Sequence, residues 1–270
     1  MSNLIPVSVQ WLTLREHADA RSRSRALASR AARGMRAPLV IHDLGSGTGS
    51  MMHWLAPLLP APQTWVLHDW NADLLGHAAE RAAVDSTGRP VAVTTSVKDV
   101  AHLRDGDLGG ATLVTMSALL DVLTRDETEA VIRACVAAGA PALFTLSVTG
   151  RVSLDPVDPG DRVFESVFND HQRRAADTRR LLGPDAGATA IDLFESAGWA
   201  VEVAETPWLL DAADRPLLDE WLEGWVAAAV EERPALEEWG DEYLRTRAVQ
   251  LAEGTLKVVV DHQDFLAWPR

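Results

Sequence analysis

The sequence predicts an α/β protein with a mostly parallel sheet that is covered by helices on both faces. Short apolar runs with β-branched residues alternate with helical segments along most of the chain, and two late strands are separated by a long helical region. A glycine-rich loop follows the first apolar run. The chain has 270 residues, of which 47% are apolar and 24% are charged, so it can bury the core of one large domain.

The first regular elements after the N-terminal segment are βα units. Residues 39–44 form an apolar run with β-branched members, closed by glycines, which is typical of a buried strand. The helical pattern that follows, at 50–59, ends near Pro60 and Pro62, because proline cannot continue a helix. The same alternation predicts strands at 64–68 and 91–95 and helices at 72–84 and 98–104.

The alternation continues and is then interrupted. We expect strands at 112–116 and 142–148, with a helix at 126–138 between them. Residues 150–183 contain two prolines and a glycine followed by a charged stretch, so we interpret them as a lid-like insertion above the sheet. Regular structure then resumes with a helix at 185–197, a strand at 199–204, a helical region at about 213–252 and an apolar strand at 256–260.

These elements divide the chain into four parts. Residues 1–37 are a helical arm, in which Trp11, Leu14 and Ala18 recur at helical spacing. The sheet begins in 38–149, is interrupted by the insertion at 150–183, and is completed by 184–270.

Composition excludes several classes of protein. A net charge of −14 disfavours binding to nucleic-acid phosphates. A single cysteine, Cys135, excludes an intrachain disulfide framework and argues against a cysteine-based metal site. The longest apolar stretch, at 134–148, is interrupted by Gly139 and Pro141, so we expect no membrane span. The first ten residues lack the pattern of a signal peptide, and the expected location is the cytoplasm.

The charges are unevenly distributed. Residues 1–37 carry seven Arg against two acidic residues, whereas residues 211–253 carry twelve acidic residues against four Arg. One interpretation is two solvated helix faces. The other is that the basic arm packs on the acidic segment, within one chain or between the chains of a homodimer.

The strongest local signal is the segment Asp-Leu-Gly-Ser-Gly-Thr-Gly at 43–49, between a predicted strand and a predicted helix. Glycines there let the backbone turn sharply and approach a ligand closely, and the helix start offers unpaired N–H groups. Asp43 would repel a nucleotide pyrophosphate but attract an ammonium group. Asp69 ends the next strand, where its carboxylate can accept both hydroxyl hydrogens of a ribose. The alternative for Asp69 is a helix N-cap, for which Asn71 is better placed.

These residues resemble the class I S-adenosylmethionine-dependent methyltransferases. Segment 43–49 is similar to the glycine motif of that family, and Asp69 matches the acidic residue that ends its second strand. The family's sheet ends in an antiparallel strand inserted between its neighbours, and residues 256–260 match that strand. The resemblance therefore implies a Rossmann-like, seven-stranded sheet with an antiparallel last strand, and S-adenosylmethionine as the cofactor.

The resemblance also implies roles for single residues. The glycines lie under the methionine moiety, and Asp43 contacts its ammonium group. Asp69 holds the ribose, Trp70 flanks the adenine, and Asp99 accepts from the adenine amino group, unless Asp99 is only a solvated acid at a helix start. The expected cofactor-binding residues are Asp43, Gly45, Ser46, Gly47, Gly49, Asp69, Trp70, Asp99, Val100 and Ser117.

The acceptor is less defined. Family members place residues such as those at 116–121 against the sulfonium and methyl group. This segment has neither the Asn-Pro-Pro-Tyr type of motif nor paired glutamates, and both absences favour a small-molecule acceptor. Oxygen is the favoured acceptor atom, with nitrogen or carbon as alternatives.

The predicted lid supplies the candidates for chemistry. A hydroxyl acceptor needs a base, and His171 is the candidate because it is the only His in 150–183. Arg151, Arg173 or Arg174 could pair with a carboxylate or phosphate on the acceptor, unless they belong to a surface helix with internal ion pairs.

Two other patterns are interpreted as structural. Asp155, Asp158 and Asp161 recur every three residues, but the intervening prolines predict a solvated turn, so no metal site is expected. Trp221 and Trp225 share a helix face and are predicted to be core, the alternative being an apolar wall over an aromatic acceptor.

Two other functions compete with methyl transfer. An NAD(P)-dependent oxidoreductase would use the same glycines and Asp69, although Asp43 and Ser50, which replaces the third glycine of the dinucleotide fingerprint, argue against it. A non-catalytic protein of the same fold could bind the nucleoside without turnover.

Overall fold

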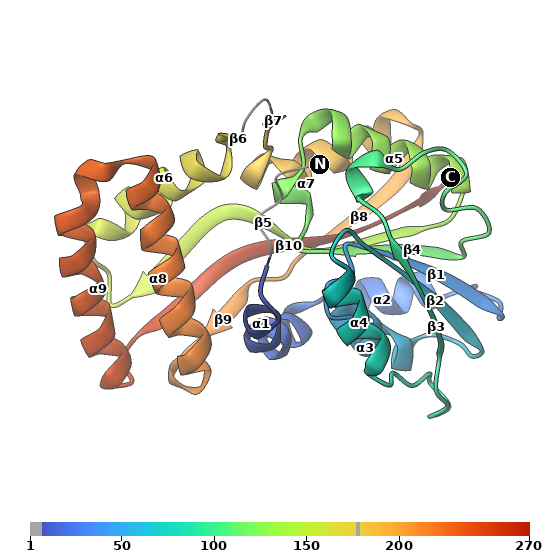
Figure 1. Cartoon of the computed structure of the whole chain (residues 1–270), viewed down its shortest axis with the longest axis horizontal. Coiled ribbons are helices and arrows are strands. Elements are labelled where there is room, and N and C mark those ends of the chain that lie inside the picture. Colours follow the sequence, from blue (N-terminus) through green and yellow to red (C-terminus); the bar gives the residue numbers. More distant parts are fainter. Residues whose placement is uncertain (1–6, 177–178) are drawn as a thin grey trace.

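A computed structural model describes residues 7–176 and 179–270 and confirms the predicted α/β architecture (Figure 1). The central sheet has the strand order β3-β2-β1-β4-β5-β10-β8, with a short β9 paired to β10. Strands β1 to β5 are parallel, and β10 lies antiparallel between β5 and β8. The strands are β1 (Leu39–Leu44), β2 (Gln63–Asp69), β3 (Ala92–Val97), β4 (Leu113–Ser117), β5 (Ala142–Asp155), β8 (Trp199–Glu205), β9 (Trp208–Leu210) and β10 (Lys257–Pro269).

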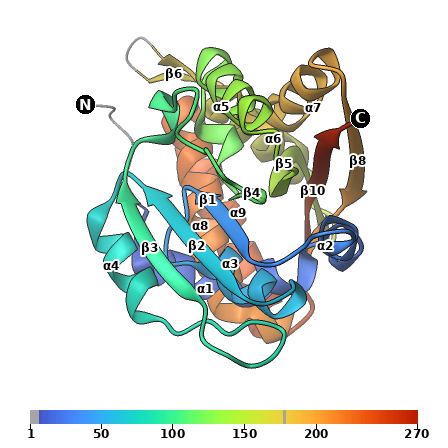
Figure 2. The ribbon, with the colours of Figure 1, turned by 90° about the vertical axis from the view of Figure 1, so that its right-hand side faces the viewer.

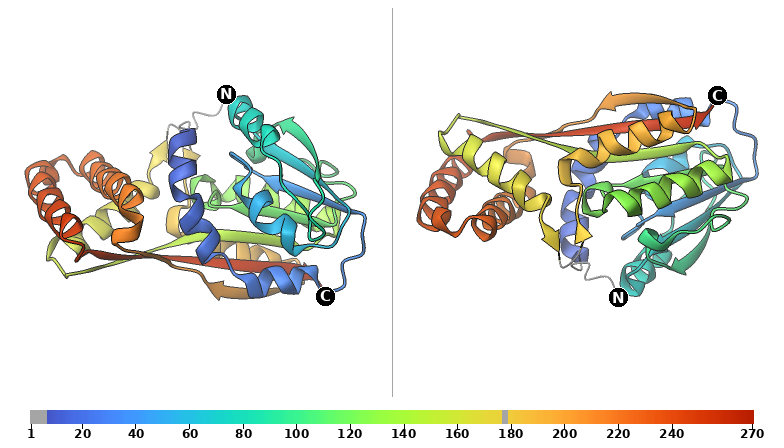
Figure 3. Two further views of the ribbon diagram at one scale, coloured as in Figure 1. Left: turned by 90° about the horizontal axis from the view of Figure 1, so that it is seen from below. Right: turned by 90° about the horizontal axis from the view of Figure 1, so that it is seen from above.

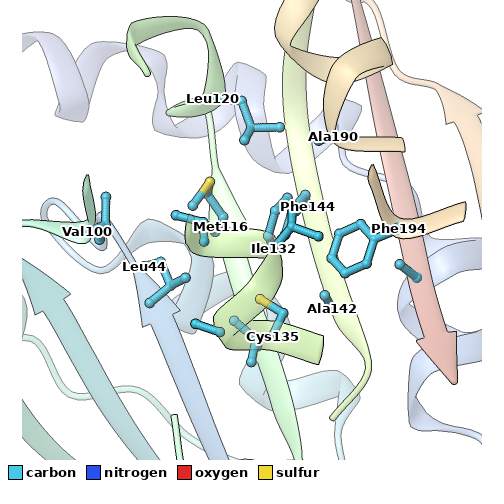
Figure 4. Packing of buried hydrophobic residues seen from close by; sticks show 14 of the residues in the cluster. Leu44, Val100, Met116, Leu120, Ile132, Cys135, Ala142, Phe144, Ala190 and Phe194 are labelled. Carbon is cyan, nitrogen blue, oxygen red and sulfur yellow. The ribbon is translucent and has the colours of Figure 1, made fainter. Parts of the chain in front are cut away.

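Helices cover both faces of this sheet (Figure 2). On one face, α5 (Arg125–Ala138) and α7 (Ala186–Ser196) pack on a core that includes Phe144 and Phe194 (Figure 4). On the other face lie α2 (Arg25–Ala32), α3 (Ser50–Leu55) and α4 (Ala72–Glu80). Within the described residues, no helix combines the length and the apolar character needed to cross a membrane.

Local sequence sets the helix ends. The side chain of Asn71 accepts from the amides of Asp73 and Leu74 and so caps α4, as its position predicted. Thr124 and Glu127 form a capping box at the start of α5. At the other end of α5, Gly139 adopts φ 66°, a left-handed conformation that glycine tolerates best.

Strands β5 and β10 are much longer than predicted. They reach Asp155 and Pro269, and they pair antiparallel over most of their length with two irregularities in register. The strand was predicted to end at residue 148 because Pro156, Pro159 and Gly160 favoured an insertion beginning at Gly150. However, Val152 and Leu154 are buried while Arg151 and Ser153 are exposed, and this alternation is the strand signal that continues past the glycine.

The extended strands carry a second lobe, which lies at the left end of the view in Figure 1. It consists of α6 (Gly160–Gln172), α8 (Arg215–Glu232) and α9 (Glu237–Ala252), packed on a core of their own. In this lobe the Tyr243 hydroxyl donates to Asp161, and Arg247 also pairs with that carboxylate. The prediction of a solvated turn is therefore wrong for Asp161, which is 7% exposed.

The N-terminal arm is folded against the rest of the chain. Its helix α1 (Val9–Ser22) stands between the second lobe and the sheet, and α2 packs on the face of the sheet at β5 and β10 (Figure 3). Arg21 donates to both oxygens of Asp214 at 2.9 Å, so the basic arm contacts the acidic region within one chain.

Smaller elements differ from the predictions. The expected helix at 98–104 is a single 3-10 turn, η2 (Val100–His102). Among its described residues, the predicted insertion at 150–183 holds the end of β5, helix α6, the short strands β6 (Ala175–Ala176) and β7 (Arg179–Arg180), and the start of the 3-10 turn η4 (Gly183–Asp185).

Candidate functional site

The glycine-rich loop connects β1 to α3 at the carboxyl end of the sheet. Gly45 and Gly47 have φ values of 63° and 53°, which disfavour other residues. A Cβ at Gly45 would lie 2.4 Å from Leu119 Cδ2, so a side chain there would displace Leu119. Gly49 caps the start of α3 at φ 81° and packs on Ala78 instead.

Asp43 lies at the end of β1 and is 1% exposed. Thr115 donates to its Oδ1 at 2.7 Å, whereas its Oδ2 is buried and has no hydrogen-bond partner among the described residues. Burial raises the pKa of this carboxyl to about 7, against the opposing effects of the Thr115 hydrogen bond and the Arg23 charge.

Asp69 ends β2 on the other side of the loop. The amides of Gly47 and Asn71 each donate to one of its oxygens at 2.9 Å. Burial raises the pKa of Asp69, although these two hydrogen bonds act in the opposite direction. The carboxylate thus holds the glycine loop against the second strand.

A cavity of about 1090 Å³, open to solvent, lies beside these residues. Nine of the ten predicted cofactor-binding residues line it, and Gly49 is the exception. At the far side, Asp99 caps the η2 turn by accepting from the Ala101 amide, Val100 is buried, and Trp70 is 39% exposed. Ser117 accepts from Thr145 at 3.0 Å at the end of β4.

Helix α1 forms one wall of the cavity, which sequence reasoning missed. Trp11, Arg15, Asp19 and Arg23 follow one another at every fourth position and all line the cavity. This spacing is the signal that could have identified a common face, although it does not say what the face packs against.

Arg23 is fully buried and reaches the centre of the site. Its Nη2 donates to Ser50 Oγ at 2.9 Å and to Ser117 Oγ at 3.0 Å. Burial lowers the pKa of this guanidinium, while the nearby carboxylates of Asp19 and Asp264 raise it. It stays a cation beside the start of α3 and the end of β4.

His171 does not line the cavity. It is buried in α6, where its Nε2 lies 3.2 Å from Glu231 and its Nδ1 lies 3.0 Å from Arg174. We therefore do not retain it as the general base, because the length of β5 carries α6 away from the glycine loop, into the second lobe.

The predicted lid contributes little to the site. Of the described residues in 150–183, only Arg179 lines the cavity, and it is paired with Glu127 at 2.6 Å. The three arginines proposed as acceptor ligands lie elsewhere: Arg151 contacts Asp261, Arg173 contacts Asp185, and Arg174 contacts His171. The N-terminal arm takes the place that the insertion was expected to fill.

No protein-family model matches the sequence, and a search of the curated proteins finds no match. Among solved structures, the chain is similar to the cyclopropane synthase MmaA2 from Mycobacterium tuberculosis, with 12% identity, a TM-score of 0.52, and coverage of 97% of this chain and 94% of that chain.

Two further structures are similar at lower TM-scores. One is a SAM-dependent methyltransferase from Thiobacillus denitrificans in complex with S-adenosyl-L-homocysteine (14% identity, TM-score 0.48, 98% of this chain and 100% of that chain). The other is magnesium protoporphyrin IX methyltransferase from Synechocystis PCC 6803 with bound SAH (17% identity, TM-score 0.47, 76% and 83%).

At such identities the likeness concerns the fold alone. The assignment of the fold rests on the match to MmaA2, because the TM-score of that match exceeds 0.5. The antiparallel β10 lies between β5 and β8, which is the strand arrangement that the sequence resemblance implied. The chain therefore has the class I S-adenosylmethionine-dependent methyltransferase fold.

Proposed function

We propose that this chain is an enzyme that binds S-adenosylmethionine and transfers its methyl group to a small-molecule acceptor. The observation that supports this most directly is the pair of buried carboxylates, Asp43 and Asp69, on either side of the glycine loop at one end of the cavity. A ligand that presents a cation to Asp43 and a diol to Asp69 fits this arrangement.

The residues around Asp43 fit the methionine part of the cofactor. The Oδ2 atom without a partner would accept from an ammonium group, and leaving it unpaired is costly in a buried site. The buried Arg23 guanidinium suits the carboxylate of the same moiety.

The residues around Asp69 fit an adenosine. Each of its oxygens already accepts one amide, and an ionised carboxylate oxygen has room for a second donor, such as a ribose hydroxyl. Trp70, Asp99 and Val100 lie beyond it on the cavity wall, where an adenine would follow the ribose.

The cofactor supplies an electrophilic methyl group on a cationic sulfur, and the chain supplies position and shielding. Trp11 and Leu12 of α1 line the cavity with apolar side chains, which reduce the contact of water with this part of the wall. Oxygen is the acceptor atom that we favour.

The same features disfavour the competing functions. The buried Asp43 would repel the pyrophosphate of NAD(P), which makes an oxidoreductase the weaker candidate. The net charge of −14 supports a small-molecule acceptor over nucleic acid, and the single buried Cys135 suits the reducing cytoplasm that we propose as its location.

Calorimetric titration of the purified chain with S-adenosylhomocysteine, NAD and NADP tests the proposal. We expect micromolar binding of S-adenosylhomocysteine and none of the dinucleotides. Binding of NAD or NADP alone, or of no compound, would contradict it. Binding of S-adenosylhomocysteine without methylation of any acceptor would favour the non-catalytic alternative.

A further inference from the structure

Besides Arg23 and Arg179, the described residues that line the cavity include one further cation. Arg15, on α1, has a side chain that is 15% exposed. Its guanidinium carbon lies 5.9 Å from the ring centroid of Trp11 and 4.9 Å from that of Trp208. Asp19 accepts from its Nε and Nη2 at 3.0 to 3.3 Å, and Nη1 takes no part in this pair. The planar fork is thus fixed with one end directed away from its partner.

The charges around Arg15 nearly cancel. Arg23, Asp19, Asp121 and His262 interact with it from α1, from the η3 turn (Leu120–Val122) and from β10. Burial lowers the pKa of His262 to about 4 and raises that of Asp121 to about 6, so at neutral pH the first is uncharged and the second is mostly ionised. Arg15 and Arg23 are the cations among these groups, and Asp19 and Asp121 are the anions. Asp43, Asp69, Asp99 and Arg179 also line the cavity, so the lining carries no excess of positive charge. An anionic acceptor would therefore be held by its direct contact with Arg15 and by its attraction to the bound sulfonium.

The cavity offers no ordinary base. The described residues that line it include no His, Lys, Tyr or Cys. Its carboxylates already have partners: Asp19 accepts from Arg15 and Trp208, and Asp69 and Asp99 accept from backbone amides. Asp43 accepts from Thr115 with Oδ1, and its second oxygen, which has no partner among the described residues, is the atom that the proposed function assigns to the ammonium group of the cofactor. An acceptor that is already ionised at neutral pH needs no proton removed, and among oxygen nucleophiles a carboxylate meets that condition.

We propose that the acceptor is a small carboxylic acid with an apolar or aromatic body, held by Arg15, and that the product is its methyl ester; this rests on the proposed methyl transfer. One carboxylate oxygen accepts from Nη1 of Arg15. The other forms the new O–CH3 bond with a lone pair, while the electron pair of the S–CH3 bond returns to sulfur. The carboxylate and the sulfonium are both neutralised, and no proton moves.

Matched pairs of compounds test the acceptor class. Benzoate, phenylacetate, cinnamate and octanoate are each compared with the primary alcohol of the same carbon skeleton, by S-adenosylhomocysteine release and mass spectrometry of the product. We expect methyl esters from at least one acid, no ethers from the alcohols, and a kcat at saturating cofactor that is independent of pH between about 6.5 and 9. Methylation of the alcohols in preference to the acids, or of neither set, overturns the inference.

A binding readout tests Arg15 without turnover. The acids should raise the melting temperature of the wild-type chain in saturating S-adenosylhomocysteine. Arg15→Met should weaken acid binding at least tenfold while S-adenosylhomocysteine affinity stays within threefold. Arg15→Lys keeps the charge and loses the planar fork, so its affinity for the acids should lie between those of the wild type and Arg15→Met. It replaces Arg15→Met in this test if the Met variant does not fold. Arg25→Met removes the same charge from the exposed start of α2 and should change neither affinity.

The outcomes separate the two proposals. Acid binding that is unchanged in both Arg15 variants overturns the inference and leaves the proposed function standing. Failure of the wild-type chain to bind S-adenosylhomocysteine overturns the proposed function itself.

Discussion

Replacing Asp43 with asparagine should make the ligand-free chain more stable at alkaline pH and a poorer binder of its cofactor. The change keeps the shape of the side chain and the acceptor for the Thr115 hydroxyl. It removes a negative charge from a fully buried position whose second oxygen has no hydrogen-bond partner among the described residues. Stability and binding should therefore move in opposite directions.

The magnitude follows from the pKa. Burial raises the pKa of Asp43 from 3.8 to about 7, so the folded chain holds this proton at pH values where the unfolded chain has released it. The free energy of unfolding then falls as pH rises from about 4 to 7, by about 4 kcal/mol in total at about 1.4 kcal/mol per pKa unit. The asparagine variant lacks this loss, but its buried amide nitrogen without a partner costs about 1–3 kcal/mol at every pH.

The clearest readout is the difference in unfolding free energy between Asp43→Asn and the wild type. Measured by urea denaturation without ligand, the free energy of unfolding of the variant should rise relative to that of the wild type by about 2–3 kcal/mol between pH 5 and pH 8. Calorimetry at pH 8 should show S-adenosylhomocysteine binding weakened roughly 10- to 100-fold, because a charged hydrogen bond contributes about 1.5–3 kcal/mol. Asp241→Asn makes the same chemical change at an exposed position of α9 and should alter neither quantity.

Two results would refute this reasoning. A stability difference that does not change with pH would mean that Asp43 ionises in the folded chain as it does in water. Unchanged S-adenosylhomocysteine affinity in a folded variant would remove Asp43 from the ammonium site.

Three other predictions test separate parts of the chain. Asp69→Ala should weaken S-adenosylhomocysteine binding by about 1–3 kcal/mol through lost hydrogen bonds, and unchanged calorimetric affinity would exclude Asp69 from the ribose site. Burial and the neighbouring His42 lower the pKa of His68 to about 4, so the unfolded chain binds this proton more readily and the free energy of unfolding should fall as pH drops from 6.5 to 4. His68→Phe should reduce that fall, as seen by urea denaturation at pH 7.5 and pH 5, and an identical fall would reject the assignment. Tyr243→Phe removes a 2.6 Å hydrogen bond to Asp161 and should cost about 1–3 kcal/mol of stability without changing S-adenosylhomocysteine affinity, and a lost affinity would show that the second lobe shapes the cofactor site.

The part of the candidate site around the glycine loop could be predicted because backbone geometry selects its residues. Gly45 and Gly47 adopt left-handed conformations that few other residues tolerate, so their places in the sequence reveal the turn. Asp43 and Asp69 end adjacent parallel strands, and parallel strands bring their carboxyl ends to one edge of the sheet. Each of these relations is local, or follows from the alternation of strands and helices.

The part of the cavity that α1 forms could not be predicted because it depends on contacts between distant segments. The position of α1 is fixed by partners such as Pro207, which accepts from Ser22, and Trp208, which donates to Asp19. No pattern in residues 1–37 identifies those partners. His171 was chosen for its place in a supposed lid, and the unexpected length of β5 carries α6, and His171 with it, into the second lobe.

Asp264 explains how the sheet itself places the arm. This carboxylate is fully buried at an irregularity of β10, where Oδ2 accepts from the Ser24 amide and Oδ1 accepts from Thr206 and from the amide of Leu146, each at 2.8 Å. Leu146 has φ 56°, a left-handed conformation that a leucine adopts only when its surroundings require it. The Asp264 side chain thus connects the start of α2 to strands β5 and β10. Because Arg23 precedes Ser24, these contacts also place Arg23 beside the glycine loop. The cavity is therefore completed by the same antiparallel strand that distinguishes this sheet, and the arm is as much a part of the site as the loop it covers.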